Sequence, residues 1–434
     1  MYKKVLLFSK KEENKELVLH SLIALVVRGG GAAASFLMNI VIARYLGVTE
    51  SGYFFLALTV ATLLSTVGRI GADQVVLRFV SVFGEKNEWD KVHAIMSKIM
   101  QWTFIGTIML TIPLCVFSKQ IAIYFFHKEE FQWSLFWAGL SMPFFSAYNV
   151  FAIVLQGRRK VLLSVTLLKI VTPFLLVVFA IFLIPTSGAI ASFYYFIACM
   201  LTLFLGYFWW KRNIPTGRGT TESAALWKSC VSLWIVAVMQ QVVLWGGQFI
   251  AGIFNTPEEL AQLAVSRNTS VLITFILTAI NYVSAPRFAS MYSAGKMEEL
   301  KSYARNTTRL MTIFAAPVLL VIWFFPSFIM SFFGKGFSEG IWLLRVLALG
   351  QFINVITGSV GYLLVMSGHE KDMRNITIIN GVLALILALI LNPFFGVIGS
   401  AISTSIALAS SNLMAVGLVK KRLGFNTLSI LGFK

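Results

Sequence analysis

Acidic side chains and metal-binding residues are scarce in this sequence. Its 434 residues contain 18 Asp and Glu against 36 Lys and Arg, and only 12% of all residues are charged. The three cysteines, Cys115, Cys199 and Cys230, lie in apolar stretches without a Cys-x-x-Cys pair, and the four histidines lack ligand spacing. We therefore expect no disulfide framework, no metal site and no cofactor.

The signatures of an enzyme are also missing. The sequence has no recognisable nucleophile–base set and no phosphate-binding glycine loop. The acidic residues at the predicted outer junctions form no recognisable catalytic pair; they are Glu129, Glu130, Glu258, Glu259 and Glu339. An enzyme is therefore not expected.

Long apolar segments dominate what is present. The apolar fraction is 58% and the mean hydropathy is +0.81, whereas a soluble domain has an apolar fraction of about 45–50%. Most of the apolar segments exceed the roughly 20 residues that span a bilayer as a helix. The sequence predicts an all-α polytopic membrane protein with twelve such segments, at Leu17–Ala43, Gly52–Phe79, Val92–Phe117, Phe131–Gln156, Val161–Ile184, Gly188–Trp210, Trp227–Phe254, Leu260–Ala285, Tyr303–Phe325, Gly340–Met366, Asn375–Pro393 and Val397–Val419.

Positive charge gathers at alternate junctions between these segments. One set of junctions holds most of the Lys and Arg residues, whereas the other set holds only Arg44, Lys119, Lys128 and Lys335. By the positive-inside rule, this asymmetry predicts that both termini are cytoplasmic. The formal net charge of +18 is then explained by topology and by contact with anionic membrane lipids, so that nucleic-acid binding is not expected.

The chain carries an internal repeat. Four short anchors recur in the same order at offsets of 208 to 211 residues, among them Glu50 with Glu258 and Pro185–Gly188 with Pro393–Gly396. Six segments separate the members of each pair, so the two copies should have the same orientation in the membrane. We predict an N-terminal six-helix bundle at 1–210, a cytoplasmic linker at 211–226 and a C-terminal six-helix bundle at 227–434.

Five charged residues lie deep within the predicted helices. They are Arg28, Arg69, Asp73, Lys169 and Arg267, four cations and one acid. A charge at this depth costs several kcal/mol and usually faces a cavity or a partner. The excess of cations favours an anionic substrate.

Polar stripes at helical spacing accompany these charges. The first and seventh segments carry Asn39 and the pair Gln241 and Gln248. The stripe of the second segment runs from Thr59 to Asp73, and that of the eighth runs from Arg267 to Asn281. Four helices are therefore expected to wall a central cavity. The predicted substrate-binding residues are Arg28, Arg267, Lys169, Arg69, Asn39, Gln241, Gln248 and Asn281.

Two of the deep cations also have purely structural interpretations. The Lys169 side chain can extend along its own helix so that its ammonium group reaches the membrane surface. Arg69 and Asp73, four residues apart, can form a self-satisfied pair, or Asp73 can serve as a coupling carboxylate for a proton or Na⁺. Both alternatives stay open from the sequence.

Two segments of this chain resemble a known family. Asn39–Tyr53, NIVIARYLGVTESGY, and Pro393–Ile402, PFFGVIGSAI, are similar to the first- and last-loop patterns of the polysaccharide-transporter branch of the multidrug/oligosaccharidyl-lipid/polysaccharide (MOP) superfamily, the Wzx-type O-antigen flippases. The resemblance implies a MATE-like fold in which two bundles alternate access to a central cavity. By position, Arg28 and Arg267 match the cationic cavity residues, and Lys169 matches them less closely.

The same resemblance implies a substrate and a location. The substrate would be a lipid-linked oligosaccharide, an undecaprenyl pyrophosphate glycan, moved from the cytoplasmic to the outer leaflet of a bacterial inner (cytoplasmic) membrane for O-antigen or another surface polysaccharide. A polysaccharide polymerase and a chain-length regulator are the implied partners. A pyrophosphate carrying about two negative charges would gain about 5 kcal/mol per 100 mV from the membrane potential.

Two other functional classes are compatible with a polytopic membrane protein. A MATE-type multidrug or cation antiporter would be expected to carry several acidic residues in the membrane, whereas Asp73 is the sole deep acid here. A membrane enzyme of the same glycan pathway would be expected to have a sizeable outer loop. Both alternatives fit the sequence less well than a flippase.

Overall fold

The protein is described by a computed structural model that consists of helices. It describes residues 2–217, 219 and 223–428, without the side chains of residues 2–28, 223–225, 228, 232 and 282. The described residues form α-helices, short 3-10 and π-helical turns and connecting loops, and no strand occurs among them. The all-α polytopic fold predicted from the sequence is therefore confirmed.

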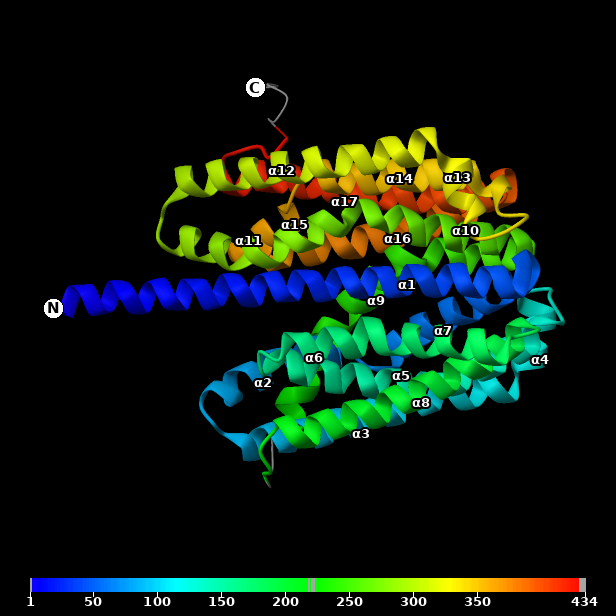
Figure 1. Cartoon of the computed structure of the whole chain (residues 1–434), viewed down its shortest axis with the longest axis horizontal. Helices are drawn as coiled ribbons and strands as arrows, with labels where there is room; N and C mark the ends of the chain where they lie inside the picture. The colour runs from blue at the N-terminus through cyan, green and yellow to red at the C-terminus, as the bar shows by residue number, and fades with distance from the viewer. Residues whose placement is uncertain (1, 218, 220–222, 429–434) are drawn as a thin grey trace.

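Helix α1 (Tyr2–Gly68) contains the first predicted segment and most of the second. Its stretch Gly29–Gly68 has 40 residues, a length of about 60 Å at 1.5 Å per residue, which is twice the thickness of a bilayer core. Gly47 divides the stretch with φ 72° and ψ −179°, and beyond it the chain turns back toward α2 (Figure 1). Among the described residues, 11 helices are long and apolar enough to cross a membrane, and Gly47 divides the first of them into two parts. Twelve crossings stay a prediction.

The helices of the N-terminal half continue from α1. Helix α5 packs against α1, α3 and α8 and forms the centre of this half. The elements are α2 (Ala72–Glu85), α3 (Trp89–Val116), α4 (Ser118–Gln120), η1 (Ile121–Phe125), α5 (Phe131–Gly157), α6 (Val161–Thr166), η2 (Leu167–Val171), α7 (Thr172–Leu183) and α8 (Gly188–Asn213).

The C-terminal half begins with α9, which packs against α16 and α17. A capping box of Thr256 and Glu259, with Pro257 in the first turn, starts α10. The elements are α9 (Ser223–Phe254), α10 (Pro257–Ser270), η3 (Val271–Thr274), α11 (Phe275–Ser293), α12 (Met297–Phe324), α13 (Pro326–Ser331), η4 (Ser338–Gly340), α14 (Ile341–Ile356), α15 (Val360–Met366), α16 (Glu370–Phe395) and α17 (Val397–Leu423).

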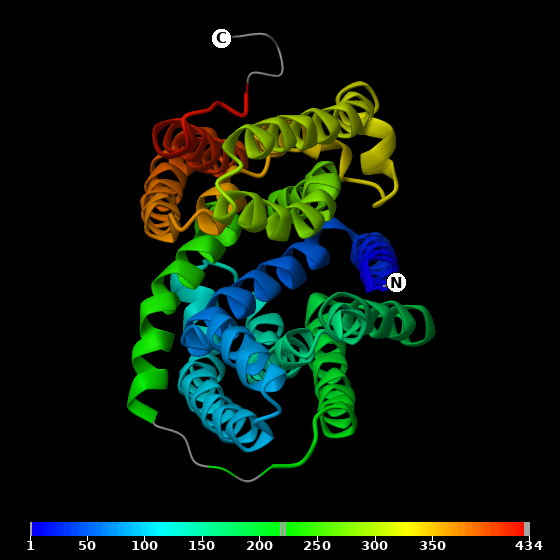
Figure 2. The same ribbon diagram turned by 90° about the vertical axis from the view of Figure 1, so that its left-hand side faces the viewer.

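The two halves form two groups of helices that lie one over the other (Figures 1 and 2). Helix α9 contacts both groups, because it packs on α1 and α2 as well as on α16 and α17. The predicted linker at 211–226 falls partly outside the described residues. The division into two domains at this linker stays a prediction.

The structure corrects the predicted second segment. The sequence suggested one continuous helix over Gly52–Phe79, but the helix ends at Gly68 and a turn over Arg69–Gly71 separates it from α2. Ile70 and Gly71 adopt left-handed conformations, with φ 49° and 71°. Because Gly71 tolerates this backbone at no steric cost, the helix can break there. Arg69 and Asp73 therefore flank a turn rather than lie on one helix.

Candidate functional site

The two halves meet tightly at one end of the molecule, which we call the sealed end. Thr49 Oγ1 donates a hydrogen bond of 2.6 Å to Glu258 Oε1. At Gly52 the helices are so close that a Cβ atom would lie 1.9 Å from the carbonyl oxygen of Pro257. Only glycine allows this approach of two backbones.

A loop of the N-terminal half reaches across the sealed end to α9. In this first clasp, residues 117–130, the Phe126 ring packs edge-on against Phe249 with 5.9 Å between centroids. Lys128 Nζ donates to the carbonyls of Phe126 and Gly252, both at 2.9 Å. Burial lowers the pKa of Lys128, and the charge of Glu259 opposes this shift.

The second clasp is a loop of the C-terminal half that reaches across to α1. In this loop, residues 325–340, the Phe333 ring packs edge-on against Phe36 with 5.5 Å between centroids. Arg44 Nε donates to the Phe332 carbonyl at 2.7 Å, and Gly336 lies against Val48. Each half therefore contacts the first helix of the other half through one clasp. In Figure 1 the ribbons of the two halves converge near α4, α10 and α13 and diverge toward α2 and α11.

Arg267 lies on α10 against the face of a tryptophan. Its guanidinium carbon is 3.2 Å from the ring centroid of Trp245, and Nη1 donates to the Leu244 carbonyl at 3.4 Å. The cation is thereby held by a cation–π contact and one hydrogen bond. Within the described part of the chain it makes no ion pair.

Two glutamines flank Trp245 on α9. Gln241 and Gln248 precede and follow it by about one turn, so that the three side chains share a face. Gln241 Oε1 and Gln248 Nε2 are buried and have no hydrogen-bond partner among the described residues. Because an unpaired buried polar atom costs about 1–3 kcal/mol, these amides are well suited to a ligand that pairs with them. Sequence reasoning named both glutamines but did not count Trp245 as a site residue.

Lys169 lies in the π-helical turn η2 and its side chain is exposed. A Cβ on Gly31 of α1 would come within 2.7 Å of the Lys169 Cβ, so these two helices touch at this point. A Cβ on Gly29 would lie 3.1 Å from the Phe275 ring of α11, so α1 and α11 are also close to each other there. The Arg28 side chain, predicted as a cavity residue, lies outside the described residues.

Arg69 and Asp73 pair with each other inside the N-terminal half. Arg69 Nε is 3.1 Å from Asp73 Oδ1, and Nη2 donates to Thr66 Oγ1 at 3.3 Å. The Arg69 guanidinium lies over the Phe145 ring of α5 at 5.7 Å. Arg69 is only 6% exposed, so its contacts are those of a bundle interior.

The two predicted asparagines are also buried. Asn281 on α11 accepts a hydrogen bond from Ser359 at the start of α15, and Asn39 on α1 is 4% exposed. The structure therefore places Arg267 against Trp245, between the turns of α9 that carry Gln241 and Gln248, and places Arg69, Asp73 and Asn281 in contacts within the bundles. The cross-contacts of Arg44 and Lys128 were not predicted, because both residues look like ordinary outer-junction cations in the sequence.

Two family models match this chain, and the first of them covers more than half of it. Residues 18–292 match the polysaccharide biosynthesis protein family, and residues 229–394 match the MatE family. A probable low-salt glycan biosynthesis flippase of Haloferax volcanii, Agl15, is 22% identical over 403 residues, which cover 88% of this chain and 79% of the relative.

Solved structures of similar fold come from transporters. An inward-facing multidrug resistance MATE family transporter of the MOP superfamily has a TM-score of 0.73 at 12% identity and covers 93% of this chain and 98% of its own. The lipid II flippase MurJ in an inward closed conformation has a TM-score of 0.72 at 17% identity, with 93% and 87% covered. The fold is therefore that of the MOP superfamily.

Proposed function

Because the chain belongs to the polysaccharide biosynthesis protein family, we propose that it is a flippase for an anionic lipid-linked oligosaccharide. The substrate would be an undecaprenyl pyrophosphate glycan that moves from the cytoplasmic to the outer leaflet of a bacterial inner membrane. A polysaccharide polymerase and a chain-length regulator would act on the glycan after it has crossed. The probable glycan biosynthesis flippase from Haloferax volcanii among its relatives supports this proposal.

The observation that carries the proposal is the set of Arg267, Trp245, Gln241 and Gln248, which we call the Arg267 group. A guanidinium held against Trp245 keeps its outward N–H groups oriented, and such a planar fork suits two phosphate oxygens. The unpaired amide atoms of Gln241 and Gln248 would bind sugar hydroxyls or phosphate oxygens nearby. Arg267 makes no ion pair among the described residues, and a cationic site of this kind disfavours a cationic drug as the substrate.

Alternating access would require the sealed end to open and close. The positive-inside rule assigns this end to the outer face, so the cavity of this conformation would open toward the cytoplasm. Release outside would require both clasps and the Gly52–Pro257 contact to separate. Arg28 and Lys169 would receive the pyrophosphate from the cytoplasmic side. In this scheme the membrane potential drives the negative substrate outward, and the Arg69–Asp73 pair acts as a support for the N-terminal half.

A matched pair of arginines tests the proposal. Arg345 also lies over tryptophans, at 5.4 Å from Trp323 and 5.0 Å from Trp342, and donates to the Trp323 carbonyl at 3.1 Å. We expect Arg267→Ala to reduce flipping of a lipid-linked oligosaccharide in proteoliposomes at least tenfold, whereas Arg345→Ala keeps most of the activity. Arg267→Lys should rescue only partly, because a lysine lacks the planar fork.

Equal activity of the two alanine variants would exclude Arg267 from substrate binding. Transport of a cationic dye in place of the glycolipid would instead support the multidrug alternative. Both variants should insert into the membrane and have the melting temperature of the original protein. A loss of activity can then be assigned to the binding site rather than to unfolding.

A further inference from the structure

A groove lies on the N-terminal half, on the side away from the C-terminal half. It has a volume of about 610 Å³ and is lined by α3, α5 and α8. Figures 1 and 2 place α3 and α8 at the edge of the molecule farthest from α12 and α17. The groove is therefore separate from the Arg267 group, which lies in the C-terminal half.

The groove has an apolar floor and a polar wall. Met100, Phe104 and Phe151 provide apolar surface, and α3 adds His93, Ser97 and Gln101 at intervals of four residues. Residues at this spacing share one helix face. Ser97 and Gln101 are exposed and have no hydrogen-bond partner in the described part of the chain. A bare polar stripe in contact with lipid tails is unfavourable, so the stripe indicates a bound polar or charged group.

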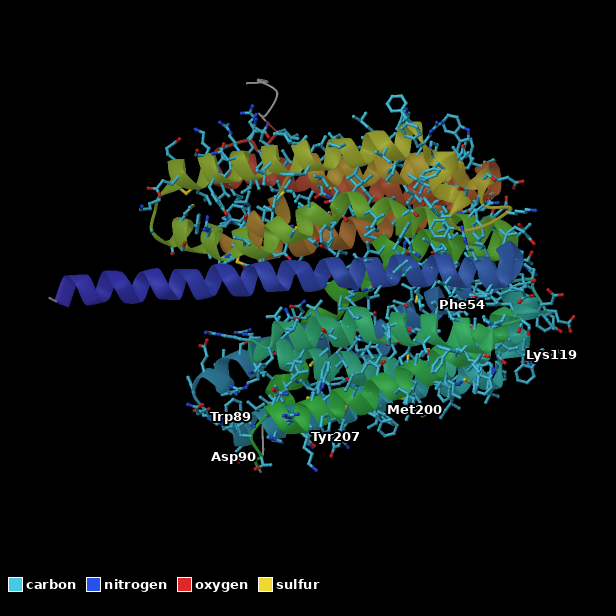
Figure 3. The ribbon with its side chains drawn as sticks, viewed as in Figure 1. Phe54, Trp89, Asp90, Lys119, Met200 and Tyr207 are labelled. Carbon is cyan, nitrogen blue, oxygen red and sulfur yellow. The ribbon has the colours of Figure 1, made fainter. Side chains whose placement is uncertain are left out.

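The depth of the groove matches one leaflet. His93 lies four residues from the start of α3 and Phe104 lies fifteen, which corresponds to about 6 and 22 Å along the helix axis. Figure 3 shows Trp89 and Tyr207 toward the end of the molecule opposite Lys119. The groove therefore runs from the headgroup level to near the middle of the membrane, at the end opposite the seal.

Positive charge borders the end of the groove near the membrane surface. Lys211 follows Tyr207 by one helical turn on α8, so it projects from the same face as this lining residue. The Lys211 side chain is exposed. The indole Nε1 of Trp210, another lining residue, is buried without a partner among the described residues and can donate a hydrogen bond.

We propose that this groove binds one anionic phospholipid of the cytoplasmic leaflet. The headgroup phosphate lies near Lys211 and His93, and an acyl chain lies along Met100, Phe104 and Phe151. Basic residues at the headgroup level of the membrane attract anionic lipids. A pocket of this volume with apolar and polar walls suits an acyl chain together with the polar part of the lipid to which it is attached.

Occupancy would act on the segment that joins the two halves. His93 Nε2 lies 2.7 Å from the Pro215 carbonyl, and the His93 and Trp210 rings are 5.1 Å apart. Gly217 and Gly219 pack against the backbone of Asp90, where a Cβ would come within 2.9 and 2.6 Å. The lipid headgroup thus lies beside the point where the linker is held to α3, so that a bound lipid stiffens this attachment.

Lipid retention by the purified full-length protein tests the proposal. Native mass spectrometry would compare phosphatidylglycerol with phosphatidylcholine at equal concentrations. We expect one phosphatidylglycerol to be retained preferentially, and Lys211→Ala to reduce its retention about fivefold. The matched control is Lys420→Ala, which removes an exposed lysine from the last turn of α17 in the other half.

A second pair of variants tests the groove itself. Ser97→Trp should fill the groove and abolish the preferential retention, whereas Met109→Trp, at a 69% exposed position on the same helix outside the groove, should leave it unchanged. Equal retention of the two phospholipids, or equal behaviour of the two tryptophan variants, would refute the site. Preferred retention of undecaprenyl phosphate over phosphatidylglycerol would also refute it and would point to the substrate's lipid. None of these measurements depends on flippase activity.

Discussion

Repeat-related positions are used differently in the two halves. Thr59 and Arg267 are equivalent by an offset of 208 residues, but Thr59 is fully buried and donates to the Phe55 carbonyl of its own helix, whereas Arg267 contacts Trp245 of a neighbouring helix. In the N-terminal half the deep charge of Arg69 is paired with Asp73. Arg69 of the N-terminal half is thus neutralised within its own half, whereas Arg267 of the C-terminal half makes no ion pair among the described residues.

The equivalent glutamates differ in the same way. Glu50 Oε2 accepts a hydrogen bond of 2.6 Å from the Gly188 backbone N–H at the start of α8, within its own half. Glu258 accepts from Thr49 of the opposite half. One copy of the carboxylate therefore stabilises a helix terminus, and the other copy joins the two halves at the seal.

The largest expected effect concerns the backbone contact at the seal. Gly52→Ala places a Cβ against Pro257, so that the sealed conformation cannot form without displacement of α10. We expect transport to be abolished and a cysteine placed at Val48 to become reactive toward an impermeant maleimide, in a background without native cysteines.

Gly30→Ala is the control on the same helix, because a Cβ there meets no atom within 4 Å. This variant should keep both activity and protection of the cysteine. Full protection in the Gly52→Ala protein would show that α10 adapts without cost, and the seal would then not depend on glycine.

The next largest effect concerns the Arg69–Asp73 pair. Asp73→Asn leaves the buried Arg69 unpaired and should lower the free energy of unfolding by about 3 kcal/mol, at the low end for buried pairs because Asp73 is 31% exposed. Arg69→Gln combined with Asp73→Asn should restore much of this loss. Arg267→Gln, which breaks no ion pair, should change stability little. Thermal unfolding in detergent measures all three.

Transport by the double variant decides between support and ion coupling. Activity like that of the original protein would leave the pair purely structural. A stable double variant that cannot transport against an opposing gradient would instead assign a coupling role to Asp73.

The smallest expected effect separates the two glutamates. Thr49→Val removes the donor to Glu258 and should weaken the seal by about 1.5 kcal/mol, a rise of roughly tenfold in labelling of the Val48 cysteine if the exposed state is rare. Glu50→Ala should lower the melting temperature and leave the labelling unchanged, because its partner lies in its own half. If Glu50→Ala instead raised the labelling and Thr49→Val left it unchanged, Glu50 rather than Glu258 would join the two halves.

The sequence predicts the helices well and the breaks in them poorly. Apolar length and charge asymmetry depend on the membrane itself, so segments such as Phe131–Gln156 agree closely with α5. The turn at Arg69–Gly71 was missed because the hydrophobic pattern continues through it, although Gly71 was a visible signal. Similarly, the π-helical turn at Lys169 leaves no mark in the periodicity.

The site was predictable as a set of residue types but not as an arrangement. Polar stripes predicted Gln241, Gln248 and Arg267, and in the structure Arg267 lies against Trp245, one helical turn from each glutamine. The clasps could not be predicted, because Phe126 and Phe333 look like the aromatic residues that commonly lie at membrane surfaces. Their partners, Phe249 and Phe36, are distant in the sequence and belong to the opposite half.

The second clasp has a consequence for biogenesis. Arg44 and Phe332 are separated by 288 residues, so the helix that receives this loop is made long before the loop. At about 5–20 residues per second, the ribosome needs roughly 15 to 60 s to supply it. During this interval lipid rather than Phe333 covers the Phe36 face of the first half, so the seal between the halves can form only after the second clasp has been synthesised.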